Sequence, residues 1–564
     1  MLTAPDGLKQ IWFSAHRQSQ YFPLAYTTFR FERALWGLNP LGYHLVNILL
    51  HGLNALLVWI LLRQLTMPAA WLVAALWALH PVQVESVAWI TELKNTQSTL
   101  FCLLAVLAWL RFANQDTTRR WWFYGAALFL QALALFSKTT ACTLPAALLL
   151  VLWWRGETIG WRRIRQVLPF LLLGVTMGLV SVWWECHMGN YQEESGAGFG
   201  WLERLLIATR ALWFYAGKLL WPATLTFSYP KWEINAREPM QYAGLIGCAA
   251  VAGLLWWQRK RMGRGVIAGM IFFVATLSPL LGFIWLYTFR YSFVADHYQY
   301  LASLGLLALA GAAVHSLCGG LERGRPLVRP VVYGALLLAL GILTWRQCGM
   351  YANGEALWRT TLARNPNCWL AHNNLGNALT AHGKLPAALP HYEMALQLNC
   401  DYPEAHNNLG SALMARGSLP AAIQHFQTAL QLNPTLSDAW YNLGNALAAQ
   451  GKLTEAIEDY ERALQIKPGL AAAHVNLGST LSAQGKWTEA IQHYERALQI
   501  KPGLPVAHFN LAAALAAQGN LVAAIRHLQQ ALELAPTQAN PVLAESIRTR
   551  LKSYQSALPQ PQIR

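Results

Sequence analysis

The sequence predicts an all-α protein in two parts, a polytopic bundle of membrane helices followed by a solenoid of paired helices. Two observations support this prediction. Hydrophobic residues make up 55% of the 564-residue chain and charged residues only 12%, which is too apolar for an ordinary soluble protein. From about residue 353 onward, continuous apolar runs give way to a motif that repeats every 34 residues.

The membrane helices are predicted from apolar runs that are long enough, or nearly so, to cross a hydrocarbon layer about 30 Å thick. These runs cover residues 43–62, 96–112, 121–136, 140–154, 166–184, 240–257, 265–287, 297–316 and 328–345. Two shorter runs, 69–79 and 205–221, lie just before a proline. With the first of these, about ten spans are expected within residues 1–350.

Basic residues decide which short run crosses, because cytoplasmic loops carry an excess of Lys and Arg. All the basic loops fall on one face if 69–79 crosses and 205–221 does not. That face then holds fifteen basic residues, Arg63, Arg111, Arg119, Arg120, Arg155, Arg162, Arg163, Arg165, Arg259, Lys260, Arg261, Arg264, Arg323, Arg325 and Arg329. Only Asp116, Glu157 and Glu322 share it, so its net charge is +12. Everything after residue 346 is then expected outside the cytoplasm.

The net charge of +16 does not indicate a nucleic-acid partner. Residues 1–350 hold 28 Lys and Arg against 14 Asp and Glu, whereas the remainder holds 15 against 13. The excess therefore lies among the spans, where it sets topology. The eight cysteines contain no CxxC pair, so neither a zinc nor a disulfide framework is predicted.

The repeat after residue 353 combines large and small residues at fixed positions. Leucines at the 34-residue period are Leu375, Leu409, Leu443, Leu477 and Leu511, followed by Gly376, Gly410, Gly444, Gly478 and Ala512. Small residues fit where two helices cross closely, and Pro434, Pro468, Pro502 and Pro536 end the second helices. This is the pattern of tetratricopeptide (TPR) units. A solenoid is predicted over 351–538, with a half-repeat, five repeats at 369–402, 403–436, 437–470, 471–504 and 505–538, and a capping helix and tail at 539–564.

Four stretches go beyond periodicity. They read YFPLAYTTFRFERALWGLNPLGYHLVNILLHGLNALLVW, ALHPVQVESVAWITELKNTQSTLF, FSKTTACTLPAALLL and ADHYQYLASLGL. In this order they resemble the membrane half of the transmembrane and TPR-containing O-mannosyltransferases and their bacterial relatives. Together with the TPR units, the resemblance covers nearly the whole chain.

The resemblance implies a GT-C-type fold for residues 1–350. It also implies a glycosyltransferase that moves a sugar from a polyprenyl-phosphate donor to a protein acceptor, recruited by the TPR groove on the extracytoplasmic side. A divalent metal stays open as a cofactor. The alternative is a non-catalytic, membrane-anchored TPR scaffold. The expected location is a bacterial inner membrane with periplasmic TPRs, or the endoplasmic reticulum membrane with lumenal TPRs in a eukaryote.

The sequence also departs from this family. Relatives usually begin with one more span and an acidic motif, commonly paired Asp, whereas MLTAPDGLKQIW resembles the family's sequence downstream of that motif. We therefore expect either a longer natural chain or the loss of that acid, for which Asp6 is a poor substitute. Phe22 and His297 stand where relatives often carry a basic residue.

Glycosyl transfer to a hydroxyl needs a carboxylate to accept the proton, and cations or a metal to stabilise the departing phosphate. On the resemblance, the catalytic candidates are Glu85 in HPVQVES and Asp296 in ADHYQY. Both are predicted at the outer membrane boundary. The alternative for each is structural, because a Glu or Asp beside a helix often caps it.

Lys138 in FSKTTACTLP is the leading candidate for holding the donor phosphate, followed by Arg290 and His297. A lysine between two spans can instead anchor a helix end at the head groups. His44, His51 and His80 match no zinc spacing, so no metal ligands are predicted among them.

In the TPR half, an asparagine precedes each repeat leucine: Asn374, Asn408, Asn442, Asn476 and Asn510. An amide both donates and accepts hydrogen bonds, so a line of amides on the inner surface can hold an extended polypeptide. The HxNLG spelling resembles the TPR units of the nucleocytoplasmic O-GlcNAc transferase, whose ladder binds acceptor peptides. Bonding within the repeat stays open as the alternative.

Overall fold

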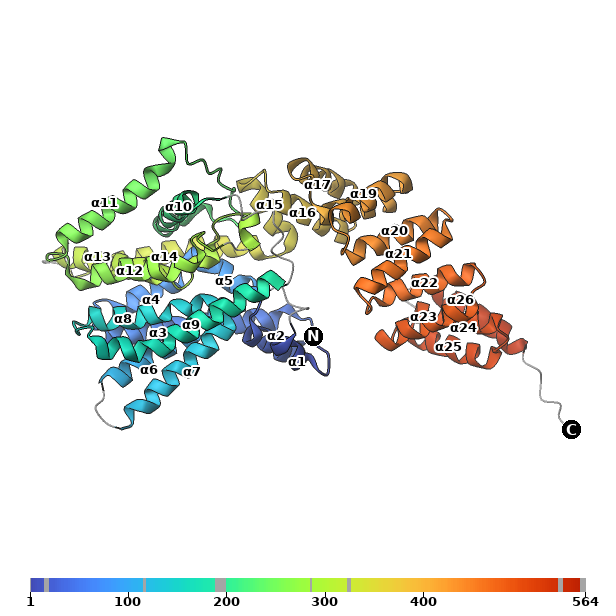
Figure 1. Cartoon of the computed structure of the whole chain (residues 1–564), viewed down its shortest axis with the longest axis horizontal. Helices are drawn as coiled ribbons and strands as arrows, with labels where there is room; N and C mark the ends of the chain where they lie inside the picture. Colours follow the sequence, from blue (N-terminus) through green and yellow to red (C-terminus); the bar gives the residue numbers. More distant parts are fainter. Residues whose placement is uncertain are drawn as a thin grey trace. The chain divides into compact units, whose positions relative to one another are not determined.

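The computed structural model describes residues 2–14, 20–114, 118–187, 199–284, 287–321, 326–535 and 541–557. Asp116, Glu322, Arg323, Arg325 and Pro536, on which parts of the sequence argument rest, lie outside these ranges. Within them every regular element is a helix, which confirms the all-α prediction. The chain divides into two compact units, Met1–Asn367 and Cys368–Arg564 (Figure 1). This division assigns the predicted half-repeat to the first unit.

The first unit is a bundle of α-helices joined by short 3₁₀ turns. The α-helices are α1 (Gly7–Phe13), α2 (Pro23–Trp36), α3 (Pro40–Gln64), α4 (Ala70–Ala78), α5 (Val84–Ala88), α6 (Leu93–Asn114), α7 (Arg120–Ser137), α8 (Leu144–Trp154), α9 (Trp161–His187), α10 (Trp201–Leu220), α11 (Ala243–Gln258), α12 (Gly263–Leu277), α13 (Ser303–Leu321), α14 (Val328–Cys348) and α15 (Gly354–Arg364). Three 3₁₀ turns matter for the site: η3 (Ile90–Glu92), η8 (Tyr287–Arg290) and η9 (Asp296–Gln299).

Seven helices of the described chain are long and apolar enough to cross a membrane, fewer than the ten spans expected. They are Pro40–Gln64, Ile90–Asn114, Trp161–Trp184, Pro239–Gln258, Gly263–Leu280, Ser303–Leu321 and Val328–Tyr351. The expected spans at 121–136, 140–154 and 69–79 form α7, the shorter apolar helix Thr139–Trp154, and the nine-residue α4. Nine helical residues rise only about 14 Å, so α4 alone cannot cross the hydrocarbon layer.

The segment from α4 to α5 is a broken helix buried inside the bundle. Leu72, Val73 and Trp77 are fully buried. The α4 helix runs alongside α14, since Trp71 contacts the ring of Tyr333 and Thr344 Oγ1 donates to Leu79 O at 2.6 Å. A broken backbone is tolerated at membrane depth only where protein covers it. The burial of α4 therefore accounts for the short apolar run at 69–79.

The predicted basic loops gather at one end of the bundle. Arg155, after α8, donates to Asn114 at the end of α6 at 2.7 Å, and Arg264 of α12 donates to Trp153 O at 3.2 Å. Arg63 at the end of α3 and Arg329 at the start of α14 line one cavity. We call this the basic end. The sequence predicted that these basic residues share one face of the membrane, because cytoplasmic loops carry an excess of positive charge.

The α12 and α13 helices cross with almost no space between their backbones. A Cβ placed on Gly305 would lie 2.4 Å from Gly269 O, and one on Gly269 would lie 3.0 Å from Gly305 O. Only glycine fits at such a crossing. Because α13 starts shortly after η9, this crossing holds the loop that carries Asp296 and His297.

The second unit consists of five helix pairs and a terminal helix. The pairs are α16 (Trp369–Ala381) with α17 (Leu385–Leu398), α18 (Pro403–Ala415) with α19 (Leu419–Leu432), α20 (Ser437–Ala449) with α21 (Leu453–Ile466), α22 (Ala471–Ala483) with α23 (Trp487–Ile500), and α24 (Pro505–Ala517) with α25 (Leu521–Leu534). Each pair lies within one predicted 34-residue repeat. The last helix, α26 (Pro541–Ser556), buries Ala544 and Ile547, and Ile547 belongs to the core cluster that contains α25.

The repeat glycines face an aromatic ring of the paired helix. A Cβ on Gly444 would lie 2.8 Å from Cε1 of Tyr460, and one on Gly478 would lie 2.8 Å from Cε1 of Tyr494. In the fifth repeat, Ala512 stands in place of the glycine. Leu528 of α25 stands in place of the aromatic residue, and both belong to one core cluster. The smaller side chain of leucine explains why a methyl group is accepted.

Four of the five repeats also join their two helices through a pair of histidines. The Nδ1 atoms of the pairs His372–His391, His406–His425, His474–His493 and His508–His527 lie 3.0 to 3.1 Å apart. In the fourth repeat, His474 Nε2 lies 3.3 Å from Pro468 O. Since a carbonyl only accepts, His474 Nε2–H donates there, and its Nδ1 accepts from His493 Nδ1–H. The pair in this form is neutral.

We expect these pairs to make the TPR unit less stable below about pH 6.5. Burial lowers the pKa of His406, His425, His474, His493, His508 and His527. A lowered pKa means that the folded state disfavours protonation, so the stabilisation present above pH 6.5 is lost as pH falls through the folded pKa values. Asp459 opposes this change, because burial raises its pKa to about 7. Thermal unfolding should show a lower midpoint at pH 5 than at pH 7.5, with a smaller drop in the variant His474→Gln/His493→Gln. An equal drop in that variant would contradict the assignment.

Candidate functional site

Polar residues from five segments meet at the end of the bundle opposite the basic end. The α6 helix ends at Asn114 near the basic residues, so its first residues after Glu92 lie at the far end, about 30 Å away for 22 helical residues. The neighbouring segments are α5, η3, the residue after α7, and η9. Four of the predicted site residues, Glu85, Lys138, Asp296 and His297, come together here.

Glu85 of α5 and His297 of η9 form a close pair. Glu85 is 2% exposed, and its Oε2 accepts from the backbone N–H of His297 at 2.9 Å. The other carboxylate oxygen, Oε1, lies 3.1 Å from His297 Nδ1 without the geometry of a hydrogen bond. A carboxylate beside an imidazole is an arrangement that accepts and passes on a proton.

A second carboxylate, Glu92, is fully buried and surrounded by cations. Its Oε1 lies 2.9 Å from Lys94 Nζ, and its Oε2 lies 4.0 Å from Lys138 Nζ. Asn95 Nδ2 donates to Glu92 Oε2 at 2.6 Å and to His297 O at 3.1 Å, and Lys138 Nζ donates to Asn95 Oδ1. Asn95 thus links both pairs into one network. Buried charges persist in proteins when they are paired and hydrogen-bonded in this way.

Asp296 is held differently from Glu85. Both of its carboxylate oxygens lie 3.0 Å from the hydroxyl of Tyr229, which donates to it. Burial, followed by the nearby charge of Glu85, raises the pKa of Asp296 well above its ordinary value. A raised pKa means that a smaller fraction of this carboxyl group is ionised and ready to accept a proton. Together with the hydrogen bond from Tyr229, this makes Asp296 a weaker candidate base than Glu85.

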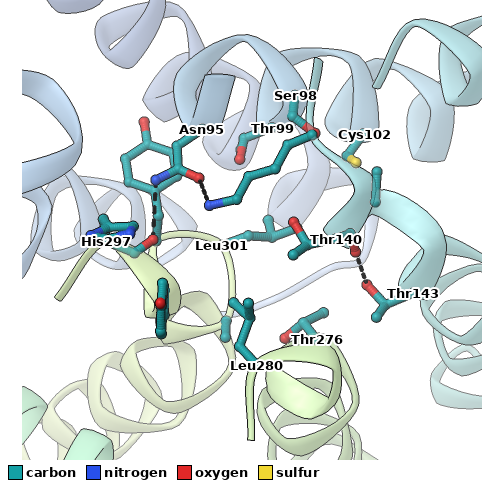
Figure 2. Close-up of a pocket in the computed structure, with 15 residues that line it drawn as sticks. Asn95, Ser98, Thr99, Cys102, Thr140, Thr143, Thr276, Leu280, His297 and Leu301 are labelled. Carbon is teal, nitrogen blue, oxygen red and sulfur yellow. Dashed lines mark hydrogen bonds between the residues drawn. The ribbon is translucent and has the colours of Figure 1, made fainter. Parts of the chain in front are cut away.

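Lys138 lines a small polar cavity of about 30 Å³. Asn95, Ser98 and Thr99 of α6, with Thr140, Thr276 and His297, form part of its wall (Figure 2). Burial lowers the pKa of Lys138 to about 8, while the charge of Glu92 acts in the opposite direction. The cavity as it stands has room for water, so a sugar phosphate could reach Lys138 only if the surrounding helix ends move apart.

Arg290 ends η8, and its charge, after burial, contributes to lowering the pKa of Lys231. Its role in holding a donor phosphate stays a prediction. Lys94 was not predicted, yet its Nζ lies 5.5 Å from the ring centre of Phe22, the position at which relatives often carry a basic residue. The sequence carries a weak signal for Glu92 and Lys94, because ionisable residues beside a long apolar segment are candidates for a functional site. No such signal marks the uncharged Asn95.

The TPR asparagines connect neighbouring repeats. Asn408 Nδ2 donates to Asn373 Oδ1 at 2.9 Å, Asn442 Nδ2 to Asn407 Oδ1 at 2.9 Å, and Asn510 Nδ2 to Ser479 Oγ at 3.1 Å. Asn476 Nδ2 donates to Asn445 Oδ1 at 2.7 Å. The amide nitrogens thus bond to the neighbouring repeat, whereas the sequence had left open a bond within one repeat or to a peptide.

No group of three or more His, Cys, Asp or Glu side chains that could hold a metal ion occurs among the residues that the structure describes.

Within the site, Gln299 is fully buried, and neither polar atom of its amide has a hydrogen-bond partner in the described chain. Such an amide is available to water or to a ligand.

Comparison with known proteins separates the chain into the same two halves. Residues 23–184 match the family model of dolichyl-phosphate-mannose-protein mannosyltransferases. Residues 376–415, 410–451, 435–502 and 469–537 match models of tetratricopeptide repeats. The chain is also similar to the crystal structure of MamA, with 27% identity, a TM-score of 0.27, and coverage of 28% of this chain and 94% of MamA.

Curated relatives span both halves. The human protein O-mannosyl-transferase TMTC1 is 28% identical over 425 residues, which cover 67% of this chain and 48% of the human protein. The protein O-mannosyl-transferase F38B6.6 of Caenorhabditis elegans is 24% identical over 411 residues, which cover 69% of this chain and 55% of that protein. The chain thus spans about half the length of these relatives. These matches confirm the resemblance seen in the sequence: the chain is similar to the transmembrane and TPR-containing O-mannosyltransferases.

Proposed function

We propose that the chain transfers mannose from a polyprenyl-phosphate donor to a hydroxyl group of a protein acceptor. The observation that supports this most directly is the buried network at one end of the bundle. It places two lysines, Lys94 and Lys138, beside a carboxylate–histidine pair, Glu85 and His297. Lysines bind phosphate, and the pair handles a proton.

In the proposed reaction the acceptor oxygen bonds to the anomeric carbon of mannose while the bond from that carbon to the phosphate oxygen breaks. Glu85 takes the proton from the acceptor hydroxyl, with His297 at 3.1 Å able to share it. The polyprenyl phosphate leaves with the bonding electrons, and the ammonium groups of Lys138 and Lys94 stabilise its negative charge. Asn95 positions Lys138.

The proposed side of the reaction is extracytoplasmic. The basic end is expected in the cytoplasm, so the site at the opposite end faces the other compartment. The last residues of the membrane unit lie near the end of the bundle that holds the site. There, Asn365 Nδ2 donates to Ser228 O at 3.1 Å, and Trp358 contacts Phe227. Phe227 in turn contacts Trp89, which follows α5. These contacts support our proposal that the TPR unit begins in the compartment of the acceptor.

Glu85→Gln should lower mannose transfer by about 100-fold or more, because a positioned base contributes that much. The measurement is the transfer of labelled mannose from polyprenyl-phosphate mannose to a peptide mixture, with full-length protein in membranes. Glu157→Gln is the matched control, since Glu157 pairs with Arg163 at 2.9 Å at the basic end. A wild-type rate in Glu85→Gln would remove Glu85 from the reaction. No transfer by the wild type would favour the scaffold function.

We further propose that the TPR unit recruits the acceptor through the Oδ1 atoms of its asparagines. Changing Asn408, Asn442 and Asn476 together to Ala should weaken the pull-down of acceptor peptides about tenfold, because three acceptors are lost. Asp at the same positions keeps the oxygen acceptors but loses the bonds to the neighbouring repeat. If Asp variants lose peptide as fully as Ala variants, the asparagines serve only to join the repeats.

A further inference from the structure

A polar cavity lies at the basic end, where α3, α6 and α8 end together. Its volume is about 300 Å³, and it is lined by Gln64 of α3, by Leu110, Arg111 and Asn114 of α6, and by Arg155 directly after α8. Two arginines from different helices therefore face one space. In the part of the chain that the structure describes, neither makes an ion pair with a carboxylate.

Both guanidinium groups are oriented by neutral neighbours. Arg155 Nη1 donates to Asn114 Oδ1 at 2.7 Å, and the guanidinium carbon of Arg111 lies 5.7 Å from the ring centre of Phe123. Neither contact neutralises the positive charge. Arginine presents a planar fork of donors that fits the oxygens of a phosphate group. The cavity thus has the chemistry of a phosphate site.

A second, apolar cavity is lined by the residues adjacent to Gln64 and Arg155 at the ends of α3 and α8. It measures about 270 Å³ and lies between α3, α8, α12 and α13, with Leu61, Leu65, Val151 and Trp154 among its wall residues. Leu65 follows Gln64, and Trp154 precedes Arg155. A polar and an apolar cavity thus share the ends of α3 and α8. A ligand with a phosphate head and a hydrocarbon tail matches this arrangement.

We infer that this place binds an anionic phospholipid, with its phosphodiester between Arg111 and Arg155 and an acyl chain in the apolar cavity. The basic end is expected at the cytoplasmic leaflet, which carries the negative lipids, and basic pockets between helices on that side bind such head groups. Its location separates this site from the proposed transfer site, which lies at the opposite end of α6. The inference does not rest on the proposed function.

Native mass spectrometry of the full-length protein in detergent tests the inference by counting bound lipids. Phosphatidylglycerol should bind about tenfold more tightly than zwitterionic phosphatidylcholine, as expected for two arginines near a phosphate. Arg111→Gln/Arg155→Gln should abolish this preference. Arg111→Lys/Arg155→Lys keeps the charge but loses the planar fork, so an intermediate preference is expected.

The matched control is Arg162→Gln/Arg165→Gln, which removes two arginines lining another cavity at the basic end. It should keep the preference for phosphatidylglycerol. Three results would overturn the inference: an unchanged preference in Arg111→Gln/Arg155→Gln, an equal loss in the control, or displacement of the lipid by inorganic phosphate at the same concentration. Tighter binding of a polyprenyl phosphate, lost in the same variant, would assign the place to the donor instead. Because lipid binding is read without mannose transfer, failure here leaves the proposed function untouched.

Discussion

Glu92→Gln is expected to destabilise the protein by about 3 kcal/mol and to lower mannose transfer by about 100-fold. Glu92 is fully buried and lies 2.9 Å from Lys94 and 4.0 Å from Lys138, which is 8% exposed. Removing its charge leaves these lysines without their carboxylate. A buried charge that loses its partner costs more than the pair contributed. Thermal inactivation in detergent measures the stability, and labelled mannose transfer measures the activity.

A second change separates the two effects. Glu92→Gln/Lys138→Met removes both charges of the more buried pair, so most of the lost stability should return. Mannose transfer should not return, because the ammonium group proposed to hold the donor phosphate is absent. If the double variant recovers transfer together with stability, Lys138 only supports the fold, and the phosphate role assigned to it is wrong.

Gly305→Ala is expected to destabilise the membrane unit by about 3 kcal/mol, a large effect for one methyl group. The added Cβ would lie 2.4 Å from Gly269 O and 3.1 Å from Phe273 N, and both are backbone atoms that cannot turn aside. The α12 and α13 helices must then separate. Since α13 follows η9, we also expect the pair of Glu85 and His297 to be displaced and mannose transfer to fall.

Gly334→Ala in α14 is the matched control, because nothing lies within 4 Å of a Cβ placed there. Alanine is the better helix former by up to about 1 kcal/mol, so this variant should be as stable as the wild type or slightly more so. The comparison uses thermal inactivation of the full-length protein in detergent. If Gly305→Ala matches Gly334→Ala in stability, the close crossing does not contribute as described.

The sequence by itself determined the features that depend on local pattern. The 34-residue period located the paired helices, because every repeat must place Leu, a small residue and Ala against its neighbours. Apolar runs located most of the membrane helices, and the basic residues between them predicted the common end that Arg155 and Arg264 share.

Only the tertiary structure decided which polar residues form the site. Lys138 meets Asn95 across 43 residues of sequence, and His297 meets Glu85 across 212. No local pattern distinguishes such a partner from a residue that caps a helix, because the distinction lies in burial and in which helix end is adjacent. Folding also brought Lys94 near Phe22, across 72 residues of sequence. Long-range packing of helix ends therefore determines the chemistry of this end of the bundle, whereas local hydrophobic periodicity determines the helices themselves.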